Sequence, residues 1–443
     1  MRRLYLLGAL CLAGCISQTP DFRETVATAK SAVAPSVVYI RVIYNDNESG
    51  KSERGVASGS GVIISADGEL LTNHHVVDKT SEIRCQLADG RAFPAKVLGK
   101  DKDLDIALLK LELPEGVTVP PAEITPRRLD VGEVVLAMGA PWGLARSVTM
   151  GIVSCNDRFL EDCGDYTLWY QTDAAISPGN SGGPLVDTDG RVVGLNARGN
   201  MYGAQAFTIP SATILEILPD LRTYGEAHWA WFGVRLQPLE DFKRNIRFDA
   251  DEGALVADVD QGSPAEKAGL RSNDLLVAVD GEKVTARFWE DIPAIERKLG
   301  RKAFEQPAAF SIVRGGEKLE IAVAPTEKGK VEGEEFVCDR WGFTAKEINR
   351  FYNPDLAFFA PEGGVYVSAT AWDGNAETCG FREKDILLAV GGTPVKTVAD
   401  VKAVYEDALA HLDERTRLPF VVARGGRKTT LVLDFTEDTE KED

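Results

Sequence analysis

Three residues whose side chains can together activate a nucleophile occur in one order along the chain: His75, Asp105 and Ser181. Ser181 lies in a glycine-rich turn between two strand-like runs. A serine hydroxyl attacks a carbonyl efficiently only when a base accepts its proton, and that base needs a carboxylate to fix its tautomer. His75 and Asp105 can supply these two groups. These residue types are therefore candidates for acyl transfer through a covalent serine intermediate.

The neighbours of these residues leave alternatives open. His74 directly precedes His75, and adjacent residues on a strand or a single helical turn point apart, so only one of them can face the nucleophile. Asp101 and Asp103 are rivals of Asp105, but only Asp105 directly precedes an apolar strand. We interpret Asp101 and Asp103 as solvated turn residues.

The run 179–183 also fits the G-x-S-x-G pattern of α/β hydrolases. That fold places a helix after the serine and the catalytic histidine later in the chain. Here Pro184 and a strand-like run follow the glycines. The two later histidines, His228 and His411, lie in stretches that favour surface or packing roles. A lipase or esterase is therefore disfavoured.

The elements that must position these residues are mainly strands. About ten strand-like runs, separated by Gly, Asp and Pro turns, fill residues 36–210, which is typical of barrels or sandwiches. Helical patterns flank them at 23–33 and 211–225. Further along, the segment 268–281 recurs at 379–392. Two copies of one module therefore follow the β-rich region.

The composition limits the class of protein. With 443 residues, 44% hydrophobic and 27% charged, the chain is long enough for about three domains with real cores. The net charge of −18 argues against nucleic acid as a partner, because phosphate binding needs clustered Lys and Arg. The sequence has no C-x-x-C pair and no H-E-x-x-H run, so we expect no metal and no organic cofactor. Cys155 and Cys163 flank a polar turn and are candidates for a disulfide.

The N-terminus has the features of an export signal. Two arginines precede an apolar run from Leu4 to Ala13 that is too short to span a bilayer as a helix. The segment 12–15, Leu-Ala-Gly-Cys, resembles a bacterial lipobox. This resemblance implies cleavage after residue 14 and a lipid on Cys15, which would anchor the folded part to a membrane outside the cytoplasm.

Three motifs carry a more specific resemblance: Thr-Asn-His-His-Val-Val at 72–77, Asp-Ile-Ala-Leu at 105–108, and the adjoining runs 171–176 and 179–184. In this order they resemble the signatures of the HtrA/Deg family of trypsin-like serine proteases, and the repeats resemble its two C-terminal PDZ domains. The resemblance implies a mainly β fold, with a chymotrypsin-like double six-stranded β-barrel followed by two PDZ (α+β) domains. The implied organisation is a lipoprotein signal peptide at 1–14, an N-terminal tether and helix at 15–35, a protease domain at 36–225, a PDZ domain at 229–327, a linker at 328–335 and a second PDZ domain at 336–437.

The resemblance also implies roles for single residues. It makes Ser181 the nucleophile, His75 the general base and Asp105 the orienting carboxylate, and it favours His75 over its neighbour. The turn formed by Gly179, Asn180 and Ser181 would be the oxyanion hole, with the backbone N–H groups of Gly179 and Ser181 as donors.

The implied specificity pocket is apolar. Ile176 lies where enzymes selective for Lys or Arg carry a buried Asp, so we expect small or medium apolar side chains before the scissile bond. The other residues that we expect to line this pocket are Asn196, Ala197 and Phe207.

Each repeat begins with a candidate carboxylate-binding loop that would receive a peptide C-terminus as an added strand. We expect the second loop to be the weaker binder. The loops comprise Phe232, Gly233 and Val234 in the first repeat and Trp341, Gly342 and Phe343 in the second.

These observations lead to one expected function and one alternative. We expect a serine endopeptidase that is lipid-anchored in the bacterial cell envelope, in the periplasm or at the outer membrane, and that cleaves unfolded or damaged proteins. Its partners would be unfolded protein or peptide substrates, peptide C-termini, and further copies of itself in a homotrimer or higher assembly. The alternative is a peptide-binding chaperone or scaffold with little proteolytic activity.

Overall fold

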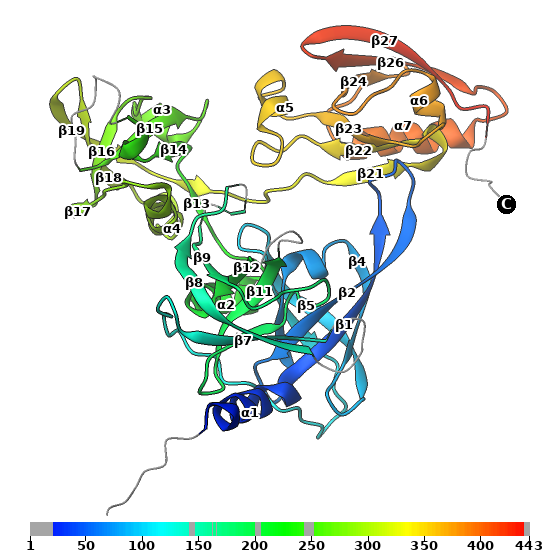
Figure 1. Cartoon of the computed structure of the whole chain (residues 1–443). Coiled ribbons are helices and arrows are strands. Elements are labelled where there is room, and N and C mark those ends of the chain that lie inside the picture. Colours follow the sequence, from blue (N-terminus) through cyan, green and yellow to red (C-terminus); the bar gives the residue numbers. More distant parts are fainter. Residues whose placement is uncertain are drawn as a thin grey trace, which may run out of the picture.

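The structure is a computed structural model that describes residues 21–437, except 141–146, 162, 165, 200–204 and 243–251. Two closed six-stranded barrels are followed by two further β-rich units (Figure 1). This arrangement confirms the mainly β fold expected from the sequence. Within the described residues, no helix is both long and apolar enough to cross a membrane. Cys15 lies outside the described residues.

The first barrel is closed by antiparallel strands in the order β1-β2-β3-β6-β5-β4. Val38, Ile40 and Val42 of β1 point into its interior, because alternate side chains of a strand face the same side. Short 3₁₀ turns, η1 (Ala34–Ser36) and η2 (His74–Val76), lie before β1 and after β3. The strands are β1 (Val37–Asp46), β2 (Glu53–Ile63), β3 (Glu69–Thr72), β4 (Thr80–Gln86), β5 (Ala92–Asp101) and β6 (Ile106–Leu111).

The second barrel closes in the order β10-β11-β12-β9-β8-β7. Its shortest strand, β10, follows the turn that carries Ser181. Cys155 and Cys163 are free thiols, so the candidate disulfide is not formed. The strands are β7 (Val134–Gly139), β8 (Ser147–Arg158), β9 (Trp169–Thr172), β10 (Pro184–Val186), β11 (Val192–Gly199) and β12 (Ala206–Pro210).

Two helices lie where the sequence pattern predicts them: α1 (Phe22–Val33) and α2 (Ser211–Tyr224). Asp21 caps α1 by accepting a hydrogen bond from a backbone N–H of its first turn. Gly225 ends α2 in the left-handed conformation, with a φ of +82°, which glycine adopts without strain. The apolar faces of both helices join a core cluster that also takes side chains from both barrels.

The first C-terminal unit is built on a sheet in the order β14-β15-β16-β18-β19, with β14 at one edge. A short pairing of β13 with β20 joins the points where the chain enters and leaves the unit. The elements are β13 (Ala230–Trp231), β14 (Val234–Gln237), η4 (Leu239–Phe242), β15 (Ala254–Val259), α3 (Pro264–Ala268), β16 (Leu275–Val279), β17 (Glu282–Lys283), η5 (Trp289–Asp291), α4 (Ile292–Gly300), β18 (Ala308–Arg314), β19 (Glu317–Val323) and β20 (Thr326–Glu327).

The second C-terminal unit repeats this order as β22-β23-β24-β26-β27 and adds one strand, β21, beside β22. The elements are β21 (Glu335–Cys338), η6 (Asp339–Trp341), β22 (Phe343–Glu347), α5 (Pro354–Phe359), β23 (Val365–Thr370), α6 (Asn375–Thr378), β24 (Ile386–Val390), β25 (Thr393–Pro394), α7 (Val398–Ala410), β26 (Arg417–Arg424) and β27 (Arg427–Asp434).

An identical ion pair in both units confirms the internal repeat. Arg314 donates to the buried carboxylate of Asp274 at 2.6 Å, and Arg424 donates to that of Asp385 at 2.7 Å. In each case the same guanidinium also donates to the carbonyl oxygen of a nearby glycine. A buried carboxylate requires such a partner, and both modules satisfy this requirement with the same pairing of an Arg with an Asp.

The second C-terminal unit rests on the first barrel. Figure 1 shows the turn between β1 and β2 reaching β21, where Asn47 donates a hydrogen bond to Glu335 at 2.8 Å. In the polar run before β21, Glu332 accepts a hydrogen bond from Lys102 of the first barrel at 2.6 Å. The segment that its composition marks as a linker therefore also forms an interface.

Candidate active site

Asp105 and His75 meet where two short segments of the first barrel adjoin. His75 lies in η2, and Asp105 directly precedes β6. Asp105 Oδ2 lies 2.8 Å from His75 Nδ1, and Asp105 Oδ1 accepts the backbone N–H of His75 at 3.0 Å. A carboxylate in this position favours the tautomer with its proton on Nδ1. The Nε2 atom is then the proton acceptor of the ring.

The backbone of Asp105 adopts an uncommon conformation. Its φ is +56°, which side chains other than glycine seldom adopt, and its side chain is almost fully buried. Asn73 donates from Nδ2 to the carbonyl oxygen of Asp105 at 3.0 Å. Such a conformation persists only when the surrounding structure holds it. The site therefore depends on the segments packed around Asp105.

The structure separates the two adjacent histidines. His74 is buried, and its Nε2 lies 3.8 Å from Asp78 Oδ1. Burial lowers the pKa of His74 from its ordinary value of 6.5, although the carboxylate of Asp78 partly opposes this shift. His75, and not His74, is thus the histidine hydrogen-bonded to Asp105.

The interpretation of Asp101 and Asp103 as solvated turn residues is wrong. Asp101 is 6% exposed and accepts a hydrogen bond from Trp229 Nε1 at 2.8 Å. Burial and the nearby charge of Asp103 raise the pKa of Asp101 to about 6. Asp103 accepts a hydrogen bond from Lys328 Nζ at 2.7 Å. Both aspartates bind residues far along the chain, which local sequence does not reveal.

The turn that carries Ser181 is fixed by a serine of the other barrel. Ser60, fully buried in β2, donates from its backbone N–H to the carbonyl oxygen of Ser181 at 2.8 Å. Its Oγ donates to the carbonyl oxygen of Gly179 at 2.6 Å. Gly182 approaches Ser60 so closely that a Cβ there would lie 2.2 Å from the Ser60 oxygen. Sequence analysis missed Ser60. Its only signal in the sequence is that a polar residue stands among the buried residues of a strand.

The hydroxyl of Ser181 is engaged within its own barrel. Its Oγ donates to the carbonyl oxygen of Ala197 on β11 at 3.1 Å. In the described part of the chain, no hydrogen bond joins Ser181 to His75. His75 and Asp105 are thus in contact, whereas the hydroxyl of Ser181 is bonded elsewhere in this state.

The turn expected to form the oxyanion hole has two unused donors. Gly179, with a φ of +97°, and Ser181 donate no backbone hydrogen bond to any described residue. The N–H of Asn180, by contrast, donates to the carbonyl oxygen of Ser177 at 2.9 Å. Asn180 therefore shapes the turn, and Gly179 and Ser181 keep the free N–H groups.

The residues expected to line the specificity pocket lie in different environments. Ile176 is half-buried and packs on a cluster of apolar side chains that also includes Tyr170. Asn196 is fully buried, and its Nδ2 donates to backbone carbonyl groups of β7 and β10, so it points into the barrel. Phe207 and Ala197 belong to the neighbouring core cluster. Of these four residues, Ala197 directly contacts Ser181.

In the first C-terminal unit the expected loop leads into an open sheet edge. Phe232 is buried and Val234 begins β14, which pairs with β15 on one side. No described strand pairs with its other side. Gly233 has a φ of +75°, and a Cβ there would lie 2.1 Å from Ser263 Cβ. A side chain at this position would therefore disrupt the loop.

In the second C-terminal unit the corresponding edge is covered. Strand β21 pairs antiparallel along β22, with Phe336 opposite Ala345. Trp341 and Phe343 of the expected loop are fully buried, and Gly342 has a φ of +74°. The position that an incoming peptide would take in this unit is thus taken by the chain's own strand.

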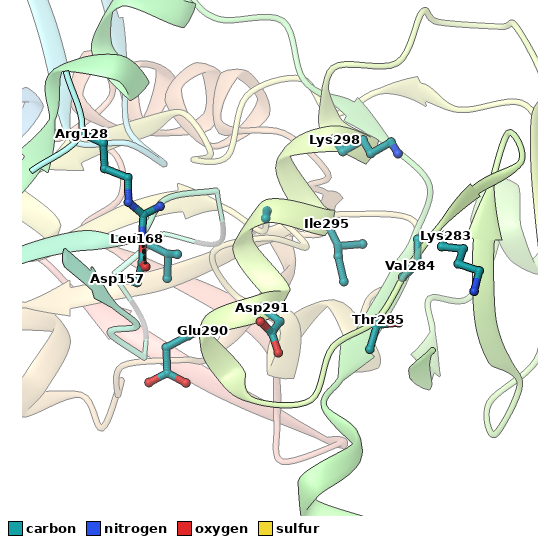
Figure 2. A pocket seen from close by; sticks show the side chains of 11 residues that line it. Arg128, Asp157, Leu168, Lys283, Val284, Thr285, Glu290, Asp291, Ile295 and Lys298 are labelled. Carbon is teal, nitrogen blue, oxygen red and sulfur yellow. Dashed lines mark hydrogen bonds and ion pairs between the residues drawn. The ribbon is translucent and has the colours of Figure 1, made fainter. Parts of the chain in front are cut away.

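A pocket of about 430 Å³ lies between the second barrel and the first C-terminal unit (Figure 2). Side chains of β17, α4 and the segment between them form one wall, and Arg128, Asp157 and Leu168 form the other. None of the three triad candidates lines this pocket. The pocket is an interdomain crevice and not the place where the chemistry described above would occur.

Comparison with known proteins points to the same chemistry. Residues 59–195 match the family model of the trypsin-like peptidase domain, and residues 231–324 match that of the PDZ domain. A protein of Hahella chejuensis named "Probable periplasmic serine endoprotease DegP-like" is 34% identical over 391 residues, which cover 85% of this chain and 80% of that protein. The chain belongs to the HtrA family of trypsin-like serine endoproteases.

Further proteins are similar over two thirds of the chain or more. A protein of Halomonas elongata with the same name is 32% identical over 399 residues, covering 88% of this chain and 81% of its own. The solved structure "HtrA-type protease AlgW with decapeptide" is 29% identical, with a TM-score of 0.59, and covers 68% of this chain and 98% of that chain. A serine endoprotease from Yersinia pestis is 28% identical, with a TM-score of 0.53, and covers 68% of this chain and 97% of that chain.

Proposed function

We propose that this HtrA protease cleaves unfolded or damaged extracytoplasmic proteins through Ser181, His75 and Asp105. The observation that carries the proposal is the 2.8 Å contact between His75 Nδ1 and Asp105. The turn that carries Ser181 packs against the end of β3, directly before η2. The distance shows how close this packing is, since a Cβ on Gly182 would lie only 2.2 Å from Thr72 Oγ. All three side chains are therefore placed on segments that touch.

The reaction begins when Ser181 Oγ leaves the carbonyl of Ala197 and turns to His75 Nε2. His75 accepts the hydroxyl proton as Oγ attacks the substrate carbonyl, and Asp105 stabilises the resulting imidazolium. The N–H groups of Gly179 and Ser181 stabilise the oxyanion, each worth about a hundredfold to a thousandfold in rate. His75 then protonates the leaving amine, and water releases the acyl group by the same steps.

The substrate residue before the scissile bond would be a small or medium apolar one. The support is the environment of Ile176, whose supporting cluster is built of apolar and aromatic side chains such as Ala137 and Leu185. We propose Ile176, Ala197 and Phe207 as the pocket and Asn196 as its buried support.

We propose that the PDZ domain receives peptide C-termini along β14. Its open edge can accept an added strand, and the loop of Phe232, Gly233 and Val234 leads directly into it. The relatives AlgW with decapeptide and AlgW with tripeptide were solved with peptides. This supports a peptide as the ligand class.

The second C-terminal unit, at 336–437, is proposed to be a second PDZ module that does not bind peptides in this state. Its shared strand order and shared Asp–Arg pair support the first part. The pairing of β21 with β22 supports the second. The domain boundaries 36–225 and 229–327 are proposed for the protease and first PDZ domains.

We further propose a lipid anchor on Cys15 and assembly into a homotrimer. The lipobox-like segment 12–15 supports the anchor, and relatives named as periplasmic support an extracytoplasmic location. Radiolabelled palmitate incorporation that is lost in Cys15→Ser tests the anchor. Light scattering of the soluble form that begins after Cys15 tests the trimer.

The direct test of the function compares one substrate in two states. The soluble form would be given a reduced, unfolded protein and the same protein in its native disulfide-bonded form, beside Ser181→Ala. We expect cleavage of the unfolded form only, and none by the variant. The alternative, a peptide-binding scaffold, predicts that Ser181→Ala and the native sequence protect an unfolded protein from aggregation equally well, with no cleavage by either. The observation that favours it is the hydrogen bond from Ser181 Oγ to Ala197.

A further inference from the structure

The turn 101–105 ends on Asp105, and the side chains of Asp101, Lys102 and Asp103 in it are each bound to a residue far along the chain. Within the turn, the N–H of Leu104 donates to Asp101 Oδ1 at 2.7 Å and the N–H of Asp105 donates to the carbonyl oxygen of Lys102 at 3.2 Å. These bonds couple the position of Asp101 to the positive φ of Asp105. Whatever holds Asp101 therefore helps to hold Asp105.

The partners of this turn come from the neck of the PDZ domain, which we define as Trp229 and Lys328. These residues flank the domain, and the N–H of Lys328 donates to the carbonyl oxygen of Trp229 at 2.8 Å. Trp229 is buried and donates from Nε1 to Asp101 at 2.8 Å. The Lys328 side chain is only 8% exposed and donates to Asp103 at 2.7 Å. Residues at both ends of the PDZ domain thus bind side chains of one turn of the protease domain.

Aromatic contacts join the neck to the segment before β9. The ring of Tyr166 stacks on Trp229 with 4.1 Å between centroids and 3° between planes, and Lys328 Nζ lies 4.7 Å from the centroid of the same Tyr166 ring. Gly164, in the same segment, packs so closely that a Cβ there would lie 2.0 Å from the carbonyl oxygen of Asp103. The neck and the turn therefore form one packed unit.

A buried carboxylate and a buried ammonium are stable only while their partners stay in place, because an unpaired charge in such a site is costly. Asp101 would lose its indole donor, and Asp103 its ammonium partner, if the neck moved away. The turn would then be free to relax from the conformation that Asp105 adopts.

We propose that Trp229 and Lys328 are positioning residues for catalysis, which hold the turn 101–105 so that Asp105 stays hydrogen-bonded to His75. The proposal rests on the proposed role of Asp105 in the triad. It predicts that changes in the neck alter the chemical step, because no hydrogen bond, ion pair or ring contact joins Trp229 or Lys328 to the nucleophile turn or to the residues proposed to line the specificity pocket in the described structure.

Two substitutions test the neck while preserving its shape. Trp229→Phe keeps an aromatic ring against Tyr166 but removes the Nε1 donor, and Lys328→Met keeps the aliphatic stem but removes the charge. The matched controls are Trp372→Phe, at a side chain that is 90% exposed, and Lys330→Met, at a side chain that is 75% exposed. All variants would be compared well below their melting temperatures.

For each neck variant we expect kcat to fall by about tenfold with KM within about twofold, since small misplacements near a reacting group carry such costs. The acid limb of the kcat/KM profile should move, because a weaker contact with Asp105 stabilises the imidazolium less. The low-field proton resonance of His75 Nδ1, identified by its loss in Asp105→Asn, should shift or broaden. A purely structural role would lower the melting temperature without moving the pH limb or this resonance.

Wild-type kcat, pH profile and Nδ1 resonance in both neck variants would overturn the proposal and leave the triad intact. If Trp229→Phe does not fold, Lys328→Met decides alone. Ser181→Ala is measured beside them. Full activity in that variant would overturn both the triad and the neck's role, whereas loss of its activity with unchanged neck variants would overturn the neck's role only.

Discussion

The hydroxyl of Ser181 donates its hydrogen bond to the carbonyl oxygen of Ala197, at 3.1 Å, on a strand of the same barrel. A nucleophile held in this way is not yet activated, because its proton does not reach the base. His75 and Asp105 are nevertheless already in contact at 2.8 Å. Of the two contacts that the proposed triad requires, the one between His75 and Asp105 is present in this state, and the one between Ser181 and His75 is not present among the described residues.

The first prediction concerns this resting state. Hydrolysis of a small chromogenic ester should be slow in the free enzyme and rise at least about fivefold when an unfolded protein substrate or a peptide with a free C-terminal carboxylate is added, because bound ligand shifts the population toward the assembled triad. Steady-state kcat/KM measures the effect, with a C-terminally amidated peptide as the control. Equal rates with and without ligand would show that the bond to Ala197 does not limit activity.

The second prediction separates the two adjacent histidines. His75→Asn removes the base and should lower kcat by about four to six orders of magnitude. His74→Asn should keep activity within about threefold, because His74 faces Asp78 and its pKa is lowered by burial. Cleavage of an unfolded protein by both variants provides the measurement. A severe loss in His74→Asn at wild-type stability would contradict the assignment.

The third prediction follows from the raised pKa of Asp101. Burial and the charge of Asp103 raise this pKa from 3.8 to about 6. A carboxyl with a higher pKa in the folded than in the unfolded state contributes stability that is complete below about pH 4 and is lost as the pH rises through about 6. The shift corresponds to about 3 kcal/mol.

The test of this prediction is the difference in unfolding free energy between wild type and Asp101→Asn. Urea unfolding at several pH values between 4 and 7.5 should show that the wild type loses stability relative to the variant as the pH rises. The comparison cancels the other titrating groups, which both proteins share. A difference that stays constant with pH would show that Asp101 titrates as an ordinary carboxyl.

The fourth prediction concerns the segment 328–335. Burial opposes ionisation of Glu332, but hydrogen bonds from Lys102 and Lys346 outweigh it and lower the pKa of Glu332 to about 2. A lowered pKa stabilises the ionised, docked state above about pH 4.5, and this contribution is lost as the pH falls through about 2. At neutral pH, Glu332→Gln should therefore loosen the second C-terminal unit.

Limited proteolysis measures this loosening. We expect cleavage within 328–335 to accelerate severalfold in Glu332→Gln and in high salt, which screens ion pairs. Glu334→Gln is the matched control, because Glu334 is 71% exposed and pairs only with the exposed Lys330, at 3.7 Å. Equal cleavage of both variants would mean that the ion pairs do not hold this segment.

The fifth prediction places the peptide site. A peptide with a photoreactive residue near a free C-terminal carboxylate should cross-link to β14 and its loop, and not to β22, whose edge is covered by β21. Mass spectrometry of the cross-linked products locates the site on the full chain. Cross-links to the loop of Trp341 and Gly342 would show that β21 yields its place to ligands.

Much of this architecture follows from local sequence. Residue periodicity predicts the strand-rich region and helices α1 and α2. The recurrence of an Asp and an Arg at matched positions indicates the tandem repeat. His75, Asp105 and Ser181 stand out because each belongs to a short motif. In the structure Asp105 contacts His75 and not His74, which supports the choice of histidine that the family resemblance favours and leaves its catalytic role a prediction.

What the sequence could not reveal depends on residues that meet only after folding. Asp101 has the local sequence of a turn residue, but it is bound by Trp229, which lies 128 positions later in the chain. Ser60 carries no motif, yet it bridges the barrels to the nucleophile turn. The polar run 328–335 has the composition of a flexible linker, but Lys102 supplies the charge that docks it. Each of these contacts is long-range, so no window of sequence contains both partners.

The central claim is that His75 and Asp105 activate Ser181, and one measurement tests it most directly. Wild type, Ser181→Ala, His75→Asn and Asp105→Asn would be incubated with a fluorophosphonate, and the modified residue and its rate of modification would be determined by mass spectrometry. We predict a single adduct on Ser181 in the wild type and none in Ser181→Ala. The rate of modification should be at least about a thousandfold lower in the His75 and Asp105 variants than in the wild type. An adduct elsewhere, or equal rates without His75 or Asp105, would contradict the central claim.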